Sequence, residues 1–186
     1  AICIAALHDN LSSNTLTKAL HMADDSDTFS RRLVQFFQTI HHIGKIIFTL
    51  GIETQDAIIS EKSFEYNFTN EGGIEGTTRF LKNICGMWIL ERCRKEWTDA
   101  PADVRQISKD SMEAEAFQHF IFPDAPDFAN PTSMVEAIQN YCQKTNQPVP
   151  EDYKAMARCI FESLAMRYRQ VLEYLKEMAP FPIARL

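Results

Sequence analysis

The sequence predicts a helix-rich α/β domain, in which a few strands are covered by long helices. Two observations carry this prediction. The last part of the chain has apolar residues at helical spacing over about six turns. The first part of the chain has short apolar segments with β-branched residues, which are typical of strands. The length of 186 residues suits one domain, or one domain with a small extension.

The amino-terminal part contains the predicted strands. Residues 1–7 are apolar and predict a short buried strand, which ends where a His-Asp-Asn triplet follows. Residues 11–42 favour an irregular helical segment. Residues 43–59 carry β-branched residues around two glycines, which predicts one or two further strands.

The middle of the chain is predicted to turn sharply and then to become helical. Residues 60–76 form a polar connection that ends with three glycines in five positions, a pattern that predicts a turn and no regular element. We expect a helix to begin at Thr77. Its predicted apolar face, at the 3/4 spacing of a helix, consists of Leu81, Ile84, Cys85 and Trp88.

The carboxyl-terminal part predicts two more helices. Ser133 and Glu136 have the spacing of a capping box, which marks a helix start. A second helix begins near Tyr153 and is the clearest element of the sequence, and Pro180 ends it. Its apolar stripe consists of Tyr153, Met156, Ala157, Ile160, Phe161, Leu164, Ala165, Tyr168, Leu172 and Leu175.

The composition disfavours several partners. The formal net charge is -6, so repulsion from phosphate groups disfavours nucleic acid and an anionic membrane surface. No apolar run approaches the roughly 18 residues of a membrane span. The five cysteines contain no Cys-x-x-Cys pair, which disfavours a zinc site and suits reduced thiols. We therefore expect a cytoplasmic protein.

Asp9 is the most suggestive carboxylate for catalysis. It follows a predicted strand, and the carboxyl ends of strands are where open α/β sheets bind ligands. A carboxylate there can take a proton from an attacking hydroxyl. The alternative is a structural turn or helix cap, because Asn10 and Ser12 follow. His41 and His42 are adjacent and point to different sides of any element, so we predict no metal site.

Two polar residues on the helix predicted from Thr77 form a second candidate site. Asn83 and Glu91 are eight positions apart, so on one helix they would lie within about 80° of each other and could flank one groove. An exposed polar edge is the alternative. The glycine turn before Thr77 could hold an anion on its backbone N–H groups, or could be only a structural turn.

The segment from Asn67 to Glu91 is the most specific part of the sequence. It contains Asn-Glu-Gly-Gly at 70–73 and Leu-Lys-Asn at 81–83. It resembles the signature of rhamnulokinases, in the FGGY family of carbohydrate kinases. The similarity extends over residues 51–186 and is strong again at residues 157–165, with a short similar segment from Ile4 to Asp9.

The resemblance implies a fold and an activity. Members have two actin-like, ribonuclease-H-like domains with a cleft between them. Residues 1–186 would be part of the carboxyl-terminal, ATP-binding domain, with residues 11–50 divergent from the family. The implied reaction transfers the γ-phosphoryl group of ATP, with Mg²⁺, to the primary hydroxyl of L-rhamnulose and gives L-rhamnulose 1-phosphate.

The resemblance also implies roles for individual residues. Asp9 would be the general base. The sugar would contact His8, Asn10 and Asn83, and the nucleotide would contact Glu91. Two further positions match family cysteines that can pair, so the resemblance allows an optional disulfide between Cys142 and Cys159.

The sequence also departs from the family. Asn10 stands where the family has Thr, and Ile46 stands where the Thr of a Ser-Ser-Gly-Thr-Trp phosphate segment is expected. The amino-terminal domain of the family has no counterpart, and the chain ends at Leu186 before the family's Gly-Gly-Gly adenosine turn.

Two hypotheses follow from these departures. The chain is part of a kinase that is inactive by itself and needs the missing domain, or it is a non-catalytic helical remnant that binds a partner or acts as a scaffold. We also expect self-association of the isolated chain through apolar surface at unpaired strand edges.

Overall fold

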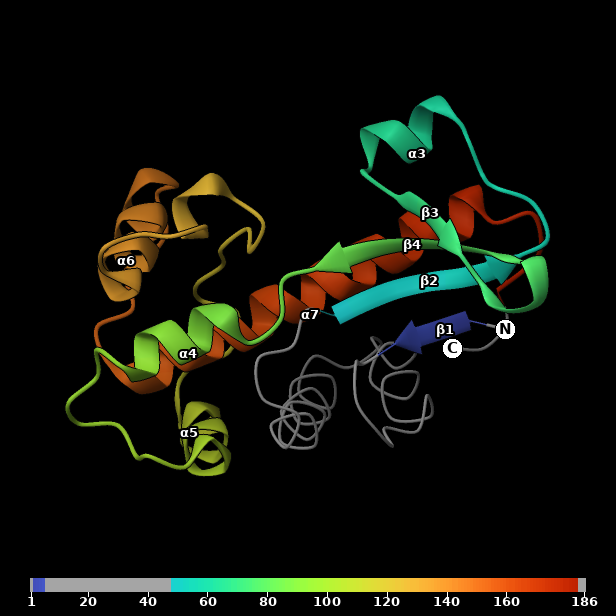
Figure 1. Ribbon diagram of the computed structural model, residues 1–186. Helices are drawn as coiled ribbons and strands as arrows, with labels where there is room; N and C mark the ends of the chain where they lie inside the picture. The colour runs from blue at the N-terminus through green and yellow to red at the C-terminus, as the bar shows by residue number, and fades with distance from the viewer. Residues whose placement is uncertain (1, 6–47, 184–186) are drawn as a thin grey trace.

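The computed structural model describes residues 2–5 and 48–183, with side chains from residue 49 onward. It contains a small antiparallel sheet and a cluster of helices, and one long helix runs through both (Figure 1). The elements are β1 (Ile2–Ala5), β2 (Phe48–Thr54), α3 (Glu61–Glu65), β3 (Thr69–Gly72), η2 (Ile74–Gly76), β4 (Thr78–Ile84), α4 (Trp88–Arg94), α5 (Val104–Asp110), η3 (Ser111–Glu113), η4 (Pro126–Phe128), α6 (Met134–Lys144) and α7 (Tyr153–Met178).

The four described strands form one sheet in the order β1-β2-β4-β3, and every neighbouring pair is antiparallel. The predicted combination of strands with a large share of helix is confirmed. The strand predicted within residues 1–7 is present as β1, and the strand predicted within residues 43–59 is present as β2. The helix predicted over residues 11–42 lies outside the described residues.

The sheet requires glycine at position 51. Gly51 in β2 pairs with Leu81 in β4 on one side and with Cys3 in β1 on the other. A Cβ atom at residue 51 would lie 2.5 Å from the Leu81 Cβ and 2.5 Å from the Phe80 carbonyl oxygen. Contacts this short do not occur between ordinary side chains, so only glycine lets β2 and β4 approach this closely.

The helix predicted from Thr77 is wrong in its first half, because residues 78–84 form strand β4. Leu81, Ile84 and Cys85 do have helical spacing. The segment also has the two-residue repeat of a strand, because Phe80, Lys82 and Ile84 occupy alternate positions and are all buried. Full pairing with β2 over seven residues decides between the two periods. The helix begins only at Trp88, as α4.

The connection predicted to be irregular over residues 60–76 contains three short elements. Ser60 caps α3 with a complete capping box with Ser63, and β3 pairs with β4. Gly72 therefore ends a strand, contrary to the prediction. The sharp turn itself is present over residues 73–77, where Gly76 has a φ of 80°. A residue with a Cβ atom is strained at this φ, which explains glycine there.

The helix α6 begins where the capping-box spacing predicts. The Ser133 hydroxyl oxygen accepts a hydrogen bond from the Glu136 backbone N–H at 3.1 Å. The side chain that completes the cap is Glu96, from the end of the α4 segment. Its carboxylate accepts from the Ser133 hydroxyl at 2.6 Å and from the Met134 N–H at 2.8 Å. Glu96 thereby joins α6 to α4 and satisfies N–H groups that a helix start leaves open.

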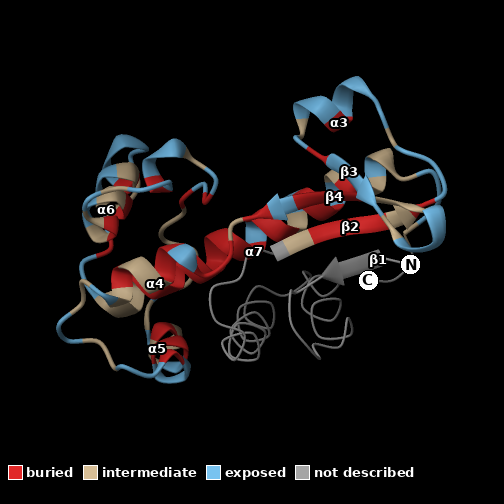
Figure 2. Cartoon of the chain, viewed as in Figure 1, coloured by how far each residue is buried: buried red, intermediate tan, exposed pale blue. Residues whose placement is uncertain are grey.

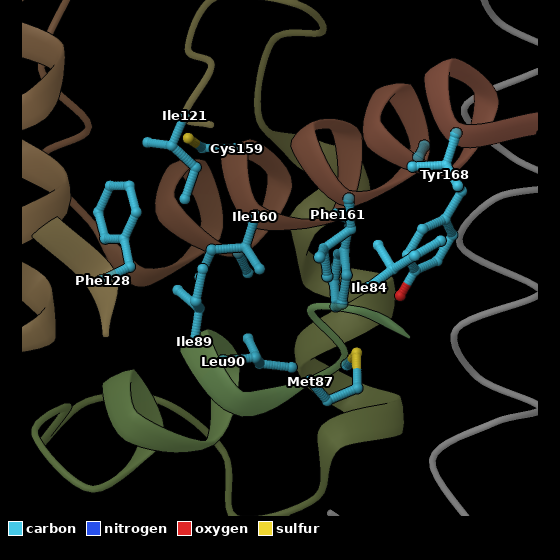
Figure 3. Packing of buried hydrophobic residues seen from close by; sticks show 14 of the residues in the cluster. Ile84, Met87, Ile89, Leu90, Ile121, Phe128, Cys159, Ile160, Phe161 and Tyr168 are labelled. Carbon is cyan, nitrogen blue, oxygen red and sulfur yellow. The ribbon is translucent and has the colours of Figure 1, made fainter. Parts of the chain in front are cut away.

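The long helix α7 confirms the clearest prediction of the sequence. Asp152 caps its first turn, and every predicted stripe residue from Met156 to Leu175 is buried. In Figure 1 its first half lies among the helices and its second half lies behind β2 and β4. Figure 2 shows burial along most of its length, whereas α3 and β3 are largely exposed. The core forms where α7 meets β4 and α4, through Ile160, Phe161 and Tyr168 packed near Ile84, Met87 and Leu90 (Figure 3).

A buried ion pair on α7 organises the loop after η3. Arg158 and Glu162 are 2.8 Å apart between Nε and Oε1, and both side chains are more than 90% buried. Arg158 Nη1 donates to the carbonyl oxygen of Ala114 at 2.8 Å, and Glu162 accepts from the Phe117 N–H at 2.9 Å. The loop backbone satisfies both charges, which a buried ion pair requires. Among the described residues, no helix combines the length and apolarity needed to cross a membrane.

Candidate functional site

The candidate site lies at one edge of the sheet, where β1 and β4 end and β2, which lies between them, begins. In register, Ala5 of β1 lies beside Thr49 of β2, and Thr49 lies beside Asn83 of β4. Because β1 and β4 are both antiparallel to β2, they run in the same direction and end at the same edge. The chain therefore leaves β1 at the edge that carries Asn83.

This edge is relevant to the predicted catalytic triplet. His8, Asp9 and Asn10 lie outside the described residues, so their roles stay predictions. Asp9 is four positions after Ala5 in the sequence. Four residues of extended chain span at most about 14 Å, which limits how far Asp9 can be from this edge.

Asn83 is exposed at this edge and is held by its neighbour across the strands. The Thr49 hydroxyl donates a hydrogen bond of 2.8 Å to the Asn83 Oδ1 atom. The bond joins residues that are 34 positions apart in the chain but directly opposite in the sheet. Thr49 has no role in the sequence-based prediction. A hydroxyl residue opposite Asn83 could be recognised from the sequence only if the strand register were known.

Lys82 lies between the buried Leu81 and the exposed Asn83 on β4 and has a structural role. It points to the opposite face from Asn83 and is only 7% exposed. Its Nζ donates to the carbonyl oxygen of Tyr66 at 2.8 Å and to that of Asn67 at 3.4 Å. Burial, above all, lowers the pKa of Lys82. The side chain ties β4 to the turn after α3 and does not face the candidate site.

Glu91 and Asn83 do not share a helix, so the predicted groove between them on one helical face is wrong. Asn83 is on β4 and Glu91 is in the first turn of α4, after a link through residues 85–87. The Tyr168 hydroxyl donates to the Cys85 carbonyl oxygen at 3.1 Å and fixes this link against α7.

The Glu91 carboxylate is already paired. Arg94, one turn later on α4, brings its Nη1 to 2.7 and 2.9 Å from the two carboxylate oxygens. Arg94 Nη2 also donates to the carbonyl oxygen of Ala102, which anchors the guanidinium. The side chains are 23% and 35% exposed for Arg94 and Glu91, so the pair is accessible from solvent. The positive charge of Arg94 therefore compensates the negative charge that Glu91 presents to solvent.

Trp88 and Arg92 form a clamp on the loop after η4. The indole Nε1 of Trp88 donates to the Phe128 carbonyl oxygen at 3.3 Å. Arg92 lies over the Trp88 ring, 5.3 Å from its centroid, and donates to Asn130 Oδ1 at 3.1 Å and to the Pro131 carbonyl oxygen at 2.7 Å. These contacts fix α4 against the loop and so stabilise the position of Glu91.

The glycine turn at residues 73–77 leads into β4 and not into a helix, so there is no helix start there to hold an anion, and of the two alternatives the structural turn is the one present. The hydrogen-bond donors of the turn instead bind a carboxylate of the protein. Glu53 of β2 accepts from the Thr77 hydroxyl and from the Ile74 N–H, the latter at 3.2 Å. The hydrogen bond from Thr77 is the main cause of the lowered pKa of Glu53. A negative charge on these groups repels an anionic ligand.

The two cysteines of the optional disulfide are neighbours with free thiols. Cys142 of α6 and Cys159 of α7 are buried and unpaired. The hydrogen bond with the Cys142 side chain, followed by burial, raises the pKa of Cys159. Within residues 2–5 and 48–183, no three His, Cys, Asp or Glu side chains lie together where they could hold a metal ion.

Comparison with known proteins gives one family match and several close relatives. Residues 47–186 match the carboxyl-terminal domain of the FGGY family of carbohydrate kinases. A protein of Bacteroides thetaiotaomicron named rhamnulokinase is 51% identical over 137 residues, which are 74% of this chain and 28% of the relative.

Two more distant relatives agree. A rhamnulokinase of Mannheimia succiniciproducens is 46% identical over 140 residues, which cover 74% of this chain and 28% of the relative. A rhamnulokinase of Bacillus subtilis is 35% identical over 134 residues, which cover 72% of this chain and 27% of the relative. The chain thus spans little more than a quarter of the length of these curated relatives.

Proposed function

Because the chain belongs to the FGGY family of carbohydrate kinases, we propose that it forms part of the ATP-binding half of a rhamnulokinase. The proposed reaction moves the γ-phosphoryl group of ATP to the primary hydroxyl of L-rhamnulose and gives L-rhamnulose 1-phosphate. The observation that carries the proposal is the 51% identity to a rhamnulokinase over 137 residues. The same match supports the actin-like, ribonuclease-H-like fold of the complete domain.

In this proposal the sheet edge is the sugar side of the site. Phosphoryl transfer depends on positioning and on neutralised charge more than on covalent help from the protein. Asp9 takes the proton of the attacking hydroxyl, an effect worth roughly 10²–10⁴-fold in rate. Asn83 donates to the sugar and holds that hydroxyl in place. The common edge reached by Ala5 and Asn83 supports this pairing of roles.

The helix α4 is the nucleotide side of the site in this proposal. A free carboxylate near the phosphates of ATP would repel them, but Glu91 is compensated by Arg94. The pair therefore fits a nucleotide contact, with Glu91 accepting from a hydroxyl or amino group of the nucleoside. Bound ATP with Mg²⁺ supplies the phosphoryl group and the neutralisation of its charge; Mg²⁺ commonly binds to substrate phosphates and few protein ligands.

Two chimeras test the proposal. In the first, residues 51–186 of this chain replace the corresponding segment of the Bacteroides thetaiotaomicron relative, and in the second residues 1–186 do so. We expect L-rhamnulose-dependent ATP consumption from the first chimera, and its loss on Asn83→Ala. A folded first chimera without that activity would contradict the kinase function of this segment.

The second chimera decides between the kinase and the non-catalytic remnant. The remnant hypothesis is favoured by residues 11–50, which diverge from the family. If the first chimera is active and the second is folded but inactive, residues 1–50, in which the two chimeras differ, abolish catalysis and this chain is a remnant. If both are active, residues 1–186 retain what this part of a kinase needs for catalysis, and the remnant hypothesis is wrong.

A further inference from the structure

We propose that Tyr168 is a positioning residue for phosphoryl transfer, which acts by fixing the short link between β4 and α4. The inference rests on the proposed function, in which Asn83 on β4 contacts the sugar and Glu91 on α4 contacts the nucleotide. It goes beyond that function because it assigns a role to a residue of α7 that is placed in contact with neither substrate.

The link determines how the two contacts lie relative to each other. β4 ends at Ile84 and α4 begins at Trp88, so residues 85–87 join the strand to the helix. The residue at the N-cap of α4 is Met87, whose side chain makes no cap hydrogen bond. A helix start without such a cap depends on its surroundings for a fixed position.

Tyr168 holds this link from α7. Its hydroxyl donates to the Cys85 carbonyl oxygen at 3.1 Å, across 83 positions of the sequence. In Figure 3 the side chain points from α7 towards Ile84 and Met87, which stand just before the link and at its end. Tyr168 is 2% exposed, and burial raises its pKa well above the usual value, so the hydroxyl keeps the proton that it donates.

The hydrogen bond has a rigid base on both sides. On α7 the neighbours Leu164 and Val171 are fully buried, so the Tyr168 ring cannot swing away without opening the core. On the other side β4 is paired with β2 over seven residues. The clamp of Trp88 and Arg92 holds α4 against the loop after η4 and not against the sheet. Loss of the Tyr168 hydroxyl would therefore let the start of α4 shift relative to β4.

The effect of such a shift should fall on the chemical step. Asn83 stays on the paired strand, and Glu91 stays bound to Arg94, so each contact remains complete. Each substrate should then bind about as before. Transfer needs the attacking oxygen about 3–3.5 Å from the phosphorus, and a misplacement of about 1 Å can cost roughly 100-fold in rate. A smaller shift, caused by one lost hydrogen bond, should cost about tenfold.

The experiment uses the first chimera, in which residues 51–186 lie within a complete kinase chain. Tyr168→Phe removes the hydroxyl and keeps the ring. The matched control is Tyr153→Phe on the same helix, whose hydroxyl donates to Asp110 Oδ2 of α5 at 2.8 Å. For each protein, the single-turnover rate of ADP formation at saturating substrates is measured together with the KM for L-rhamnulose and for ATP. Circular dichroism checks that each variant is folded at the temperature of the assay.

We expect Tyr168→Phe to lower the single-turnover rate about tenfold and to leave both KM values within about threefold of the unmodified chimera. Tyr153→Phe should keep the rate within about twofold. Instability cannot imitate this result, because a tenfold loss through unfolding would leave only about one tenth of the protein folded, and circular dichroism would detect it.

The remaining outcomes separate the inference from the proposed function. An unchanged rate in Tyr168→Phe, or an equal loss in both variants, overturns the role of Tyr168 and leaves the kinase function standing. A rise of either KM beyond the stated range in Tyr168→Phe also overturns it, since the residue would then act on binding. A folded unmodified chimera without activity overturns the proposed function, and the inference with it.

Discussion

One nitrogen of Arg94 contacts both carboxylate oxygens of Glu91, at 2.7 and 2.9 Å. The first prediction concerns this pair. Arg94→Met leaves the Glu91 charge uncompensated, so in the first chimera we expect the KM for ATP to rise roughly tenfold with little change in the KM for L-rhamnulose. The rise should shrink at high salt. Glu91→Gln together with Arg94→Met should restore the KM, and an equal rise in both KM values would refute the charge argument.

The second prediction concerns the close approach of β2 and β4. Gly51→Ala places a Cβ atom 2.5 Å from the Leu81 Cβ, and the strands must move apart. We expect a loss of about 1–3 kcal/mol in the free energy of unfolding, measured by urea denaturation. Gly72→Ala is the matched control, because a Cβ atom there meets nothing within 4 Å. Similar losses in both variants would contradict the steric explanation.

The third prediction concerns the buried ion pair of α7. Arg158→Met leaves the Glu162 carboxylate buried without its cation, which should cost about 3–5 kcal/mol of unfolding free energy. Lys154→Met removes the cation of the more exposed pair with Glu113 and should cost less than about 1 kcal/mol. Chemical denaturation of both variants gives the comparison, and comparable costs would show that burial is not the cause.

The fourth prediction concerns pH. Hydrogen bonds from Thr77 and Ile74 lower the pKa of Glu53 in the folded state. The folded protein thus binds fewer protons than the unfolded chain, so this stability is present above the unfolded pKa, near 4.3, and disappears as the pH falls through the folded pKa. Glu53→Gln should reduce stability at pH 7, and its difference from the unmodified chain should narrow below about pH 4.3. A difference that is constant with pH would exclude the ionised carboxylate as the source.

The fifth prediction concerns self-association. Ile59 precedes α3 and is 87% exposed, and Phe64 lies within α3 and is 89% exposed. Such exposure is unusual for large apolar side chains. We expect Phe64→Glu to lower the apparent mass of the isolated chain by light scattering at high protein concentration. Its thermal midpoint should not change, because the side chain makes little contact with the core. A chain that is already monomeric at high concentration would remove the basis for this expectation.

The sequence predicts best those elements whose apolar residues fit only one spacing, either that of a helix or that of a strand. The stripe from Met156 to Leu175 has only one interpretation, and α7 matches it. The segment from Thr77 to Trp88 fits two periods, and the choice between strand and helix depends on β2, which lies far away in the sequence. Local periodicity contains no information about that partner, so the prediction failed there.

The candidate site follows the same division. Asn83 could be selected from a sequence motif, and it is indeed the exposed polar residue of its strand. Thr49 and Arg94 could not, because one acts across strands and the other through a bond to a neighbour on α4. The roles of His8, Asp9 and Asn10 stay predictions, since these residues lie outside the described part of the chain.

The course of α7 has a consequence for how the molecule loses its structure. One uninterrupted helix contributes core residues both to the sheet and to the cluster of α4 and α5. Neither part can open fully without removing a packed face from that helix. We therefore expect the described region to melt in one cooperative step, with the backbone amides of α7 between Met156 and Leu175 the slowest to exchange with deuterium.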